Sequence, residues 1–131
     1  MRILIVEDAD SIRHMIEALL TARGHAVVAV SNGVRGVEAA LAAPPDVILL
    51  DLHLPGALDG FAVCRKLREE PATRDVPIVV ISAMTDAGSK QRALEAGTTA
   101  YYTKPFSPTA LLKEIESIPE RVGKRTKPSG T

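Results

Sequence analysis

The chain has 131 residues, which is enough for one hydrophobic core and too few for two. Its 16 Lys and Arg residues balance 16 Asp and Glu residues, so no net charge favours binding to nucleic acid or to an anionic membrane. The single cysteine, Cys64, excludes an internal disulfide and fits a reducing compartment. No stretch approaches the roughly 20 apolar residues of a membrane span, and no signal peptide is recognisable. These features predict a soluble cytoplasmic protein.

Short runs rich in Val, Ile and Leu, and one aromatic run, predict the β-strands. A continuous apolar run of strand length is typical of a strand buried on both faces, as in a parallel sheet covered by helices. The predicted strands are 2–6, 25–30, 46–51, 77–82 and 100–103.

Helical spacing of apolar residues follows each predicted strand. We expect the first helix to end before Gly24, and Pro44 and Pro45 to close the second. The residues that mark the five apolar faces are Ile12, Met15, Ile16, Leu19 and Leu20; Val34, Val37 and Leu41; Phe61, Val63, Cys64 and Leu67; Ala93 and Leu94; and Leu111, Leu112 and Ile115.

Strands that alternate with helices predict an α/β fold with a five-stranded, doubly wound parallel sheet and helices on both faces. The expected strand order is the flavodoxin-like 2-1-3-4-5, in which ligands bind between the ends of strands 1 and 3. Residues 1–118 form this predicted domain. Residues 119–131 are basic, contain Pro and Gly and have no apolar period, so we expect a flexible basic tail or linker there.

Chemically active side chains stand where the predicted strands end. Glu7 and Asp8 follow the first strand, Asp51 ends the third, Ser82 ends the fourth and Lys104 follows the fifth. Because the carboxyl ends of parallel strands share one edge of the sheet, these groups are expected to converge. Clustered carboxylates favour a hard divalent cation, and one of them could attack phosphorus. Any single acid could instead be a turn former or helix cap.

With these residues in place, the chain resembles the receiver domains of two-component response regulators over about residues 1–118. The matching motifs are Ile-Leu-Ile-Val-Glu-Asp at 3–8, Leu-Leu-Asp-Leu-His-Leu-Pro-Gly at 49–56, Val-Val-Ile-Ser-Ala at 79–83, Ala-Leu-Glu-Ala-Gly at 93–97 and Tyr-Tyr-Thr-Lys-Pro-Phe at 101–106. Each motif is weak alone, and their order and spacing make the resemblance specific. It implies a phosphoacceptor domain of a phosphorelay whose only chemistry, phosphotransfer and dephosphorylation, is on itself, and not an enzyme.

The resemblance implies a role for each acid. Asp51 would be the phosphoacceptor, which takes a phosphoryl group from a phosphohistidine on a histidine kinase or a histidine phosphotransfer protein. Asp8 and the Asp51 side chain would bind Mg²⁺ directly, with Glu7 acting through a bound water and the backbone carbonyl of His53 as a further ligand. The His53 side chain is expected to face solvent.

Lys104, joined by a cis peptide bond to Pro105 in such domains, would pair with Asp51 and then with the phosphoryl oxygens. Ser82 and Tyr101 would form the switch, which changes the face made by the fourth helix, fifth strand and fifth helix. A role for Tyr101 as a plain core aromatic stays open. The switched face would act on a downstream output domain or target protein, and a homodimer through it is left open.

Two positions tune phosphate lifetime in this family, the second after the phosphoacceptor and the second after the hydroxyl residue. Here they are His53 and Met84, and an apolar Met84 predicts slow self-dephosphorylation. The loop glycine usually lies eight residues after the phosphoacceptor, but Gly60 lies nine after Asp51. One extra residue therefore leaves the shape of this loop unpredicted. Gly88 is unusual within a helix.

Other functions are open on the sequence alone. A degenerate receiver could bind partners without phosphorylation. A phosphatase of the haloacid dehalogenase type also uses a strand-end aspartate, but it needs a second aspartate where His53 stands and a larger body than this chain. The only basic cluster, 121–127, is not followed by a helix-turn-helix, so we expect no nucleic-acid binding by this domain.

Overall fold

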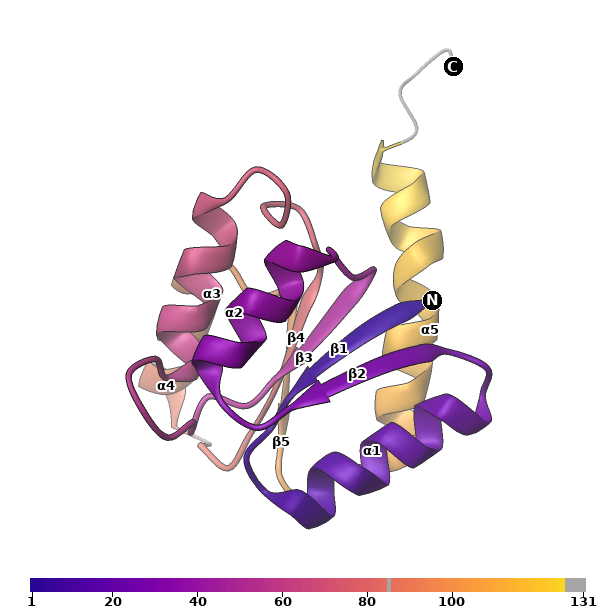
Figure 1. Ribbon diagram of the computed structural model, residues 1–131, viewed down its shortest axis with the longest axis horizontal. Coiled ribbons are helices and arrows are strands. Elements are labelled where there is room, and N and C mark those ends of the chain that lie inside the picture. Colours follow the sequence, from indigo (N-terminus) through magenta and orange to yellow (C-terminus); the bar gives the residue numbers. More distant parts are fainter. Residues whose placement is uncertain (85, 127–131) are drawn as a thin grey trace.

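The computed structural model describes residues 1–84 and 86–126, with side chains described up to residue 118. Each predicted strand is present, with bounds that agree to within one residue. The elements in chain order are β1 (Arg2–Val6), α1 (Asp10–Ala22), β2 (Ala26–Val30), α2 (Gly33–Ala42), β3 (Val47–Leu50), α3 (Gly60–Glu69), β4 (Ile78–Ser82), α4 (Ala87–Ala96), β5 (Ala100–Thr103) and α5 (Pro108–Thr126) (Figure 1).

The strands form one parallel sheet in the order β2-β1-β3-β4-β5, which confirms the predicted topology. β1 and β3 are neighbours, and their register ends level, with Val6 opposite Leu50. The next residues, Glu7 and Asp51, therefore leave the sheet side by side. This register fixes the place of the site described below.

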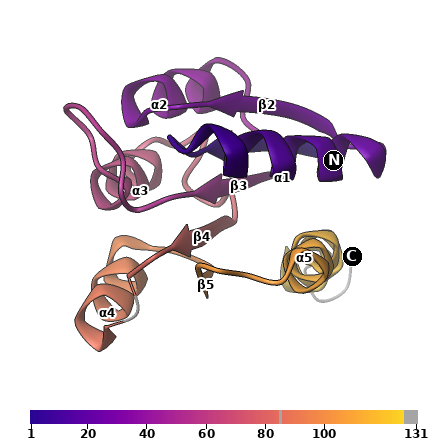
Figure 2. The ribbon, with the colours of Figure 1, turned by 90° about the horizontal axis from the view of Figure 1, so that it is seen from below.

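Helices cover both faces of the sheet, with α2, α3 and α4 on one side and α1 and α5 on the other (Figure 2). Successive strand residues point to opposite faces, so each strand contributes side chains to the hydrophobic core on each side of the sheet. The buried strand residues on the α2–α3–α4 side are Leu4, Val6, Ile48, Leu50, Ile78 and Val80, and those on the α1–α5 side are Ile3, Ile5, Val47, Leu49, Val79 and Ile81.

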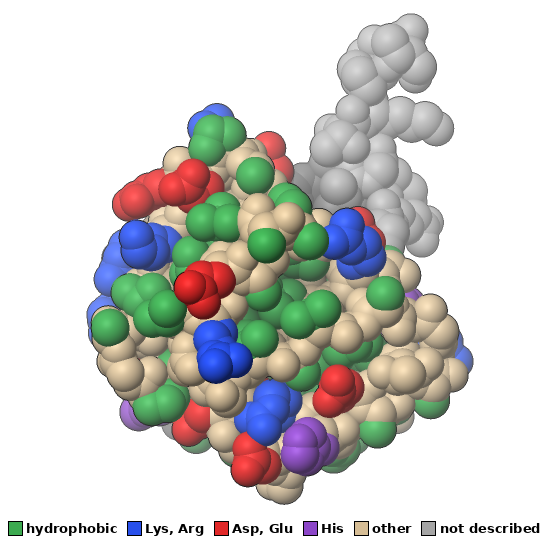
Figure 3. All heavy atoms as spheres, viewed as in Figure 1, with side chains coloured by type: hydrophobic (Ala, Val, Ile, Leu, Met, Phe, Trp, Pro, Cys, Tyr) green, Lys and Arg blue, Asp and Glu red, His purple; other side chains and the backbone are tan. Residues whose placement is uncertain are grey.

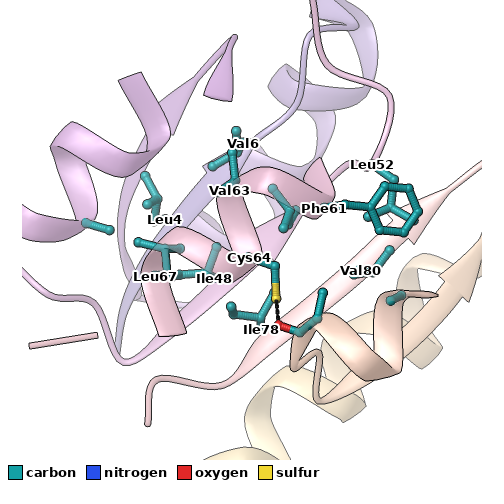
Figure 4. Packing of buried hydrophobic residues seen from close by; sticks show 14 residues of the cluster. Leu4, Val6, Ile48, Leu52, Phe61, Val63, Cys64, Leu67, Ile78 and Val80 are labelled. Carbon is teal, nitrogen blue, oxygen red and sulfur yellow. Dashed lines mark hydrogen bonds between the residues drawn. The ribbon is translucent and has the colours of Figure 1, made fainter. Parts of the chain in front are cut away.

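Cys64 lies fully buried in the α2–α3–α4 core, as the packed thiol that its helical position predicts (Figure 4). Its Sγ donates to the carbonyl oxygen of Ala96 at 3.0 Å, which joins α3 to the end of α4. Burial raises the pKa of the thiol and outweighs the opposing effect of Arg68. The thiol therefore stays protonated and serves packing.

α2 buries its small residues, in contrast to the apolar face predicted for it. Gly33, Gly36 and Ala40 are buried, whereas Val34 and Leu41 are 44% and 38% exposed. A Cβ atom at Gly36 would lie 2.9 Å from Val6 Cγ2, so the helix approaches the sheet too closely for larger side chains. Close approach, not hydrophobicity, decides which side of α2 faces inward.

The loop with the extra residue, 52–59, is packed onto the domain. Leu54 and Leu58 lie against the α2–α3–α4 core, and Gly56 turns the chain with φ of +89°. The Leu58 carbonyl oxygen lies against α2, 2.4 Å from where a Cβ atom at Gly33 would be. The insertion is therefore accommodated by a glycine in another element.

α5 continues across Pro119 to Thr126, further than the sequence predicted, and it projects beyond the sheet (Figure 1). The strong helix formers after residue 119, Glu, Arg and Lys, favour this continuation. The flexible tail predicted for 119–131 is thus wrong for 119–126, which is helical, while 127–131 lie outside the described residues; the division of the chain at 118 stays a prediction. No helix in the described part is long and apolar enough to span a bilayer. On the face shown in Figure 3, acidic and basic side chains are interspersed with apolar ones.

An ion cluster joins α5 to the residues just before β1 and β2, at the edge of the sheet where these strands begin. Glu116 accepts from Arg23 at 2.8 Å and lies 3.0 Å from His25 Nε2, while His25 Nδ1 lies 3.1 Å from the amino group of Met1. The hydrogen bond from Arg23, followed by that from His25, lowers the pKa of the Glu116 carboxyl to about 2. The ionised carboxylate is thus the form that the folded protein prefers.

Gly33→Ala should destabilise the fold by about 1–3 kcal/mol, because the new methyl group meets the Leu58 backbone. Gly88→Ala is the matched control, since its Cβ atom would lie 3.4 Å from the nearest atom, the flexible Asp86 Oδ2. It should stabilise the protein by about 0.5–1 kcal/mol, as Ala for Gly does within a helix. Urea unfolding measures both. Equal stability of the two variants would contradict the packing argument.

Glu116→Gln should lower the free energy of unfolding at neutral pH, and this effect should shrink as the pH falls from 4.5 and be small only near pH 2. The reference pKa of 4.5 falls to about 2 on folding, so the ionised group adds stability above pH 4.5. That contribution is lost as pH falls through this window. Urea unfolding of the wild type and the variant at several pH values tests this, with Glu38→Gln on the exposed side of α2 as control. A difference between wild type and Glu116→Gln that does not change with pH would show that the ion cluster is not linked to folding.

Candidate functional site

Three carboxylates meet at the carboxyl edge of the sheet, between β1 and β3. The amide of Glu7 still donates to Val30 of β2, and the amide of Asp51 donates to Val6 at 2.9 Å, so both residues are fixed by the sheet. One oxygen from each of Glu7, Asp8 and Asp51 lies within 4.8 Å of the others. Glu7 and Asp51 are buried and Asp8 is exposed.

Lys104 reaches these acids from the end of β5. Its Nζ lies 2.7 Å from Glu7 Oε1 and 3.3 Å from Asp51 Oδ2. Its backbone amide donates to the carbonyl of Ser82, and its peptide bond to Pro105 is cis. The sequence predicted the contact with Asp51 but not the shorter one with Glu7. No motif signals that second contact, because it depends on how far the lysine side chain extends between the strand ends.

Burial raises the pKa of Glu7 to about 7, against the lowering effect of the hydrogen bonds from Lys104 and from the Ala9 amide. The neighbouring Asp51 raises it further. For Lys104, burial lowers the pKa, but the bonds and charges of Glu7 and Asp51 outweigh it and leave the pKa raised. The ammonium therefore stays charged at neutral pH. One ammonium among three acids leaves a site that attracts a further cation.

The donor set fits a hard cation. All three side chains offer carboxylate oxygen, which Mg²⁺ prefers. The backbone of His53 lies beside them, because its amide donates to Asp51 Oδ1 at 3.1 Å. Its imidazole is exposed, so no nitrogen ligand enters the cluster. The site is compatible with Mg²⁺.

The backbone of Gly60 lies close against the backbone of Asp51. A Cβ atom at Gly60 would lie 2.4 Å from the carbonyl oxygen of Asp51 and 2.4 Å from Leu52 Cα. α3 therefore begins in direct contact with the backbone that carries the acid, and Asp59 caps it by accepting from the Ala62 amide. Sequence reasoning used Gly60 only as a spacing marker. The Asp-Gly pair before an apolar run was the available signal for the cap.

Ser82 and Tyr101 are linked through the backbone of Met84. Ser82 is fully buried, and its Oγ accepts from the Met84 amide at 3.1 Å. The Tyr101 hydroxyl donates to the Met84 carbonyl at 2.7 Å, and Lys90 Nζ lies 5.8 Å from the centre of its ring. The Tyr102 hydroxyl instead donates to Glu114 on α5. The Tyr101 hydroxyl thus connects β5 to the loop after β4.

Residues 3–116 match the family described as the response regulator receiver domain. The response regulator PleD of Caulobacter vibrioides is 38% identical over 117 residues, which are 89% of this chain and 26% of that protein. The transcriptional regulatory protein CseB of Streptomyces avermitilis is 39% identical over 127 residues, which are 97% of this chain and 52% of that protein. The chain thus spans about a quarter to about half of the length of these relatives.

Solved structures show the same fold. A putative response regulator from Chloroflexus aurantiacus superposes with a TM-score of 0.83 at 32% identity, over 89% of this chain and 95% of that one. The receiver domain of the sensor histidine kinase PA1611 from Pseudomonas aeruginosa, which has a magnesium ion in its active-site cleft, gives 0.81 at 35% identity, over 88% and 93%. With the matching fold and acidic cluster, these findings confirm the resemblance seen in the sequence. The chain belongs to the response regulator receiver domain family of two-component systems.

Proposed function

We propose that Asp51 accepts a phosphoryl group from a phosphohistidine on a histidine kinase or histidine phosphotransfer protein in the cytoplasm. The observation that carries the proposal is the gathering of Asp51 with Glu7 and Asp8 within 4.8 Å, with Lys104 at 3.3 Å from Asp51. The relatives named as regulators support a signalling role over catalysis on an external substrate.

In the proposed reaction an Asp51 carboxylate oxygen attacks phosphorus in line with the departing imidazole. The new O–P bond forms as the P–N bond breaks, and the imidazole takes up a proton. Lys104, charged and close to Asp51 Oδ2, is placed to pair with phosphoryl oxygens as they arrive. Asp8, Asp51, Glu7 through water, and the His53 carbonyl would hold Mg²⁺. When bound there, that ion would neutralise charge on the carboxylate and the phosphoryl group.

The proposed switch follows the hydrogen bonds around Met84. A phosphoryl oxygen on Asp51 would accept a hydrogen bond from the Ser82 hydroxyl, which at present accepts from Met84. Movement of Ser82 would then change the Met84 backbone to which Tyr101 is bonded. The face of α4, β5 and α5 would change with it and present a new surface to an output domain, a target protein or a second copy.

A degenerate receiver that binds partners without phosphorylation remains the alternative outcome. The three acids gathered with Lys104, whose amide donates to the Ser82 carbonyl, favour a receiver that is phosphorylated. A dehalogenase-type phosphatase is not favoured, because His53 occupies the position of its second aspartate and the imidazole is exposed.

Incubation with acetyl phosphate and Mg²⁺ should add a single acid-stable, base-labile phosphate, which is absent from Asp51→Asn because that variant lacks the nucleophile. Asp75→Asn, at an exposed acid in the loop before β4, should label as the wild type does. Intact-mass spectrometry measures the label. A labelled Asp51→Asn would refute the assignment, and an unlabelled wild type would point to the degenerate receiver.

Self-dephosphorylation should be slow, and Met84→Asn should accelerate it by on the order of tenfold, because hydrolysis needs a water held in line by a polar group. The Met84 side chain is partly buried against the core and offers no strong donor or acceptor. Met84→Leu is the matched control and should keep the slow rate. Loss of phosphate is followed by mass spectrometry after removal of the donor. Rapid loss in the wild type, unchanged by either substitution, would exclude Met84 from this role.

A further inference from the structure

Arg13 is hydrogen-bonded to the backbone of the acidic loop that leads from β1 into α1. Its Nη1 donates to the carbonyl oxygen of Glu7 at 2.9 Å and, more weakly, to that of Asp8 at 3.4 Å. Its Nη2 donates to Asp10 Oδ1 at 2.5 Å. The Arg13 side chain is only 13% exposed, whereas that of Asp10 is 78% exposed. The guanidinium is therefore packed against the loop and not extended into solvent.

This placement is not explained by the needs of the helix. A cation in the first turn opposes the positive end of the helix dipole. α1 begins at Asp10 without a side-chain cap on its first amides, since its N-cap residue is Ala9. Helical side chains lean toward the N-terminus, which lets Arg13 reach back over the loop. The arginine thus serves the loop that precedes the helix.

We propose that Arg13 is a positioning residue for the cation site. By binding the backbone of Glu7 and Asp8, it keeps the Asp8 carboxylate facing Asp51. The proposal rests on the proposed function of the acidic cluster. Glu7 has its own side-chain partners, Lys104 and the Ala9 amide. Among the described side chains, none bonds to the Asp8 carboxylate. Its direction is therefore set by the backbone that Arg13 binds on both sides of Asp8.

The charge of Arg13 is balanced locally. A bare guanidinium near the cluster would repel a divalent cation, but the bond to Asp10 places an opposite charge beside it. The pair thus supplies directed hydrogen bonds to the loop with little net charge.

A charge effect of Arg13 and a positioning effect of Arg13 predict opposite changes in Mg²⁺ affinity. If Arg13 acted only through its charge, its removal would strengthen Mg²⁺ binding. If it positions the loop, its removal must weaken binding. Lysine cannot replace it fully, because one planar guanidinium serves the two carbonyls and Asp10 with different nitrogens, whereas an ammonium is a single point.

Mg²⁺ titration by calorimetry of the wild type, Arg13→Ala, Arg13→Lys and Arg65→Ala tests the proposal. Arg13→Ala should bind Mg²⁺ about 10- to 100-fold more weakly, as is usual when a residue that orients a metal ligand is lost. Arg13→Lys should fall between this variant and the wild type. Arg65→Ala removes an exposed arginine from α3 and should bind as the wild type does. At saturating Mg²⁺ the rate of labelling by acetyl phosphate should recover in Arg13→Ala.

Asp8→Ala, which removes the ligand itself, should abolish binding and not recover. Unchanged or tighter Mg²⁺ binding in Arg13→Ala, beside a wild type that binds and an Asp8→Ala that does not, would overturn this proposal alone. No binding by the wild type would overturn the proposed cation site and this proposal together. If thermal unfolding shows that Arg13→Ala does not fold, Arg13→Lys decides, and affinity equal to that of Arg65→Ala would overturn the proposal.

Discussion

The burial of two carboxylates side by side, Glu7 and Asp51, is the constraint on which the rest of the site depends. The level register of β1 and β3 places both acids just beyond the last paired residues, where each is 3% exposed. Two like charges removed from water are unfavourable unless they are paired or share a proton. Lys104 contacts both carboxylates and so offsets part of the cost of burying them. The pKa of Glu7 is still raised, because burial outweighs the stabilisation that Lys104 gives to its ionised form.

Incomplete compensation is what gives the site its chemistry. A site neutralised by lysines alone would be a stable ion-pair network with no reason to take up a ligand. Here one ammonium faces three acids, and the third, Asp8, is exposed at the entrance. A bound divalent cation would complete the balance, and a phosphoryl group on Asp51 would then meet positive charge and not the bare carboxylates. The unfavourable burial of these carboxylates and the proposed ability of the site to bind a cation are thus the same property.

The sequence predicted the strands and the strand-end acids because each depends on a local pattern that the parallel sheet preserves. It failed where packing distance decides. In α2 the small Gly36 faces the sheet and Val34 is exposed, and in α4 Ala93 is buried while Leu94 is 58% exposed. Hydrophobicity alone cannot show how closely a helix approaches its sheet. The proposed role of Arg13 has no sequence signature for a related reason, since its hydrogen bonds go to backbone carbonyls.

The same packing suggests how a signal would leave the site. The C-terminal end of α4 is held to α3 by the bond from Cys64 to the Ala96 carbonyl and by two bonds from Arg68 to the Gly97 carbonyl. The N-terminal end instead follows the loop after β4, whose backbone is bonded to Tyr101. One end of the helix is thus anchored, and the other follows the loop of the proposed switch. Under the proposed switch, a change at Ser82 would therefore reach α4 from its N-terminal end, while the bonds from Cys64 and Arg68 hold its C-terminal end in place.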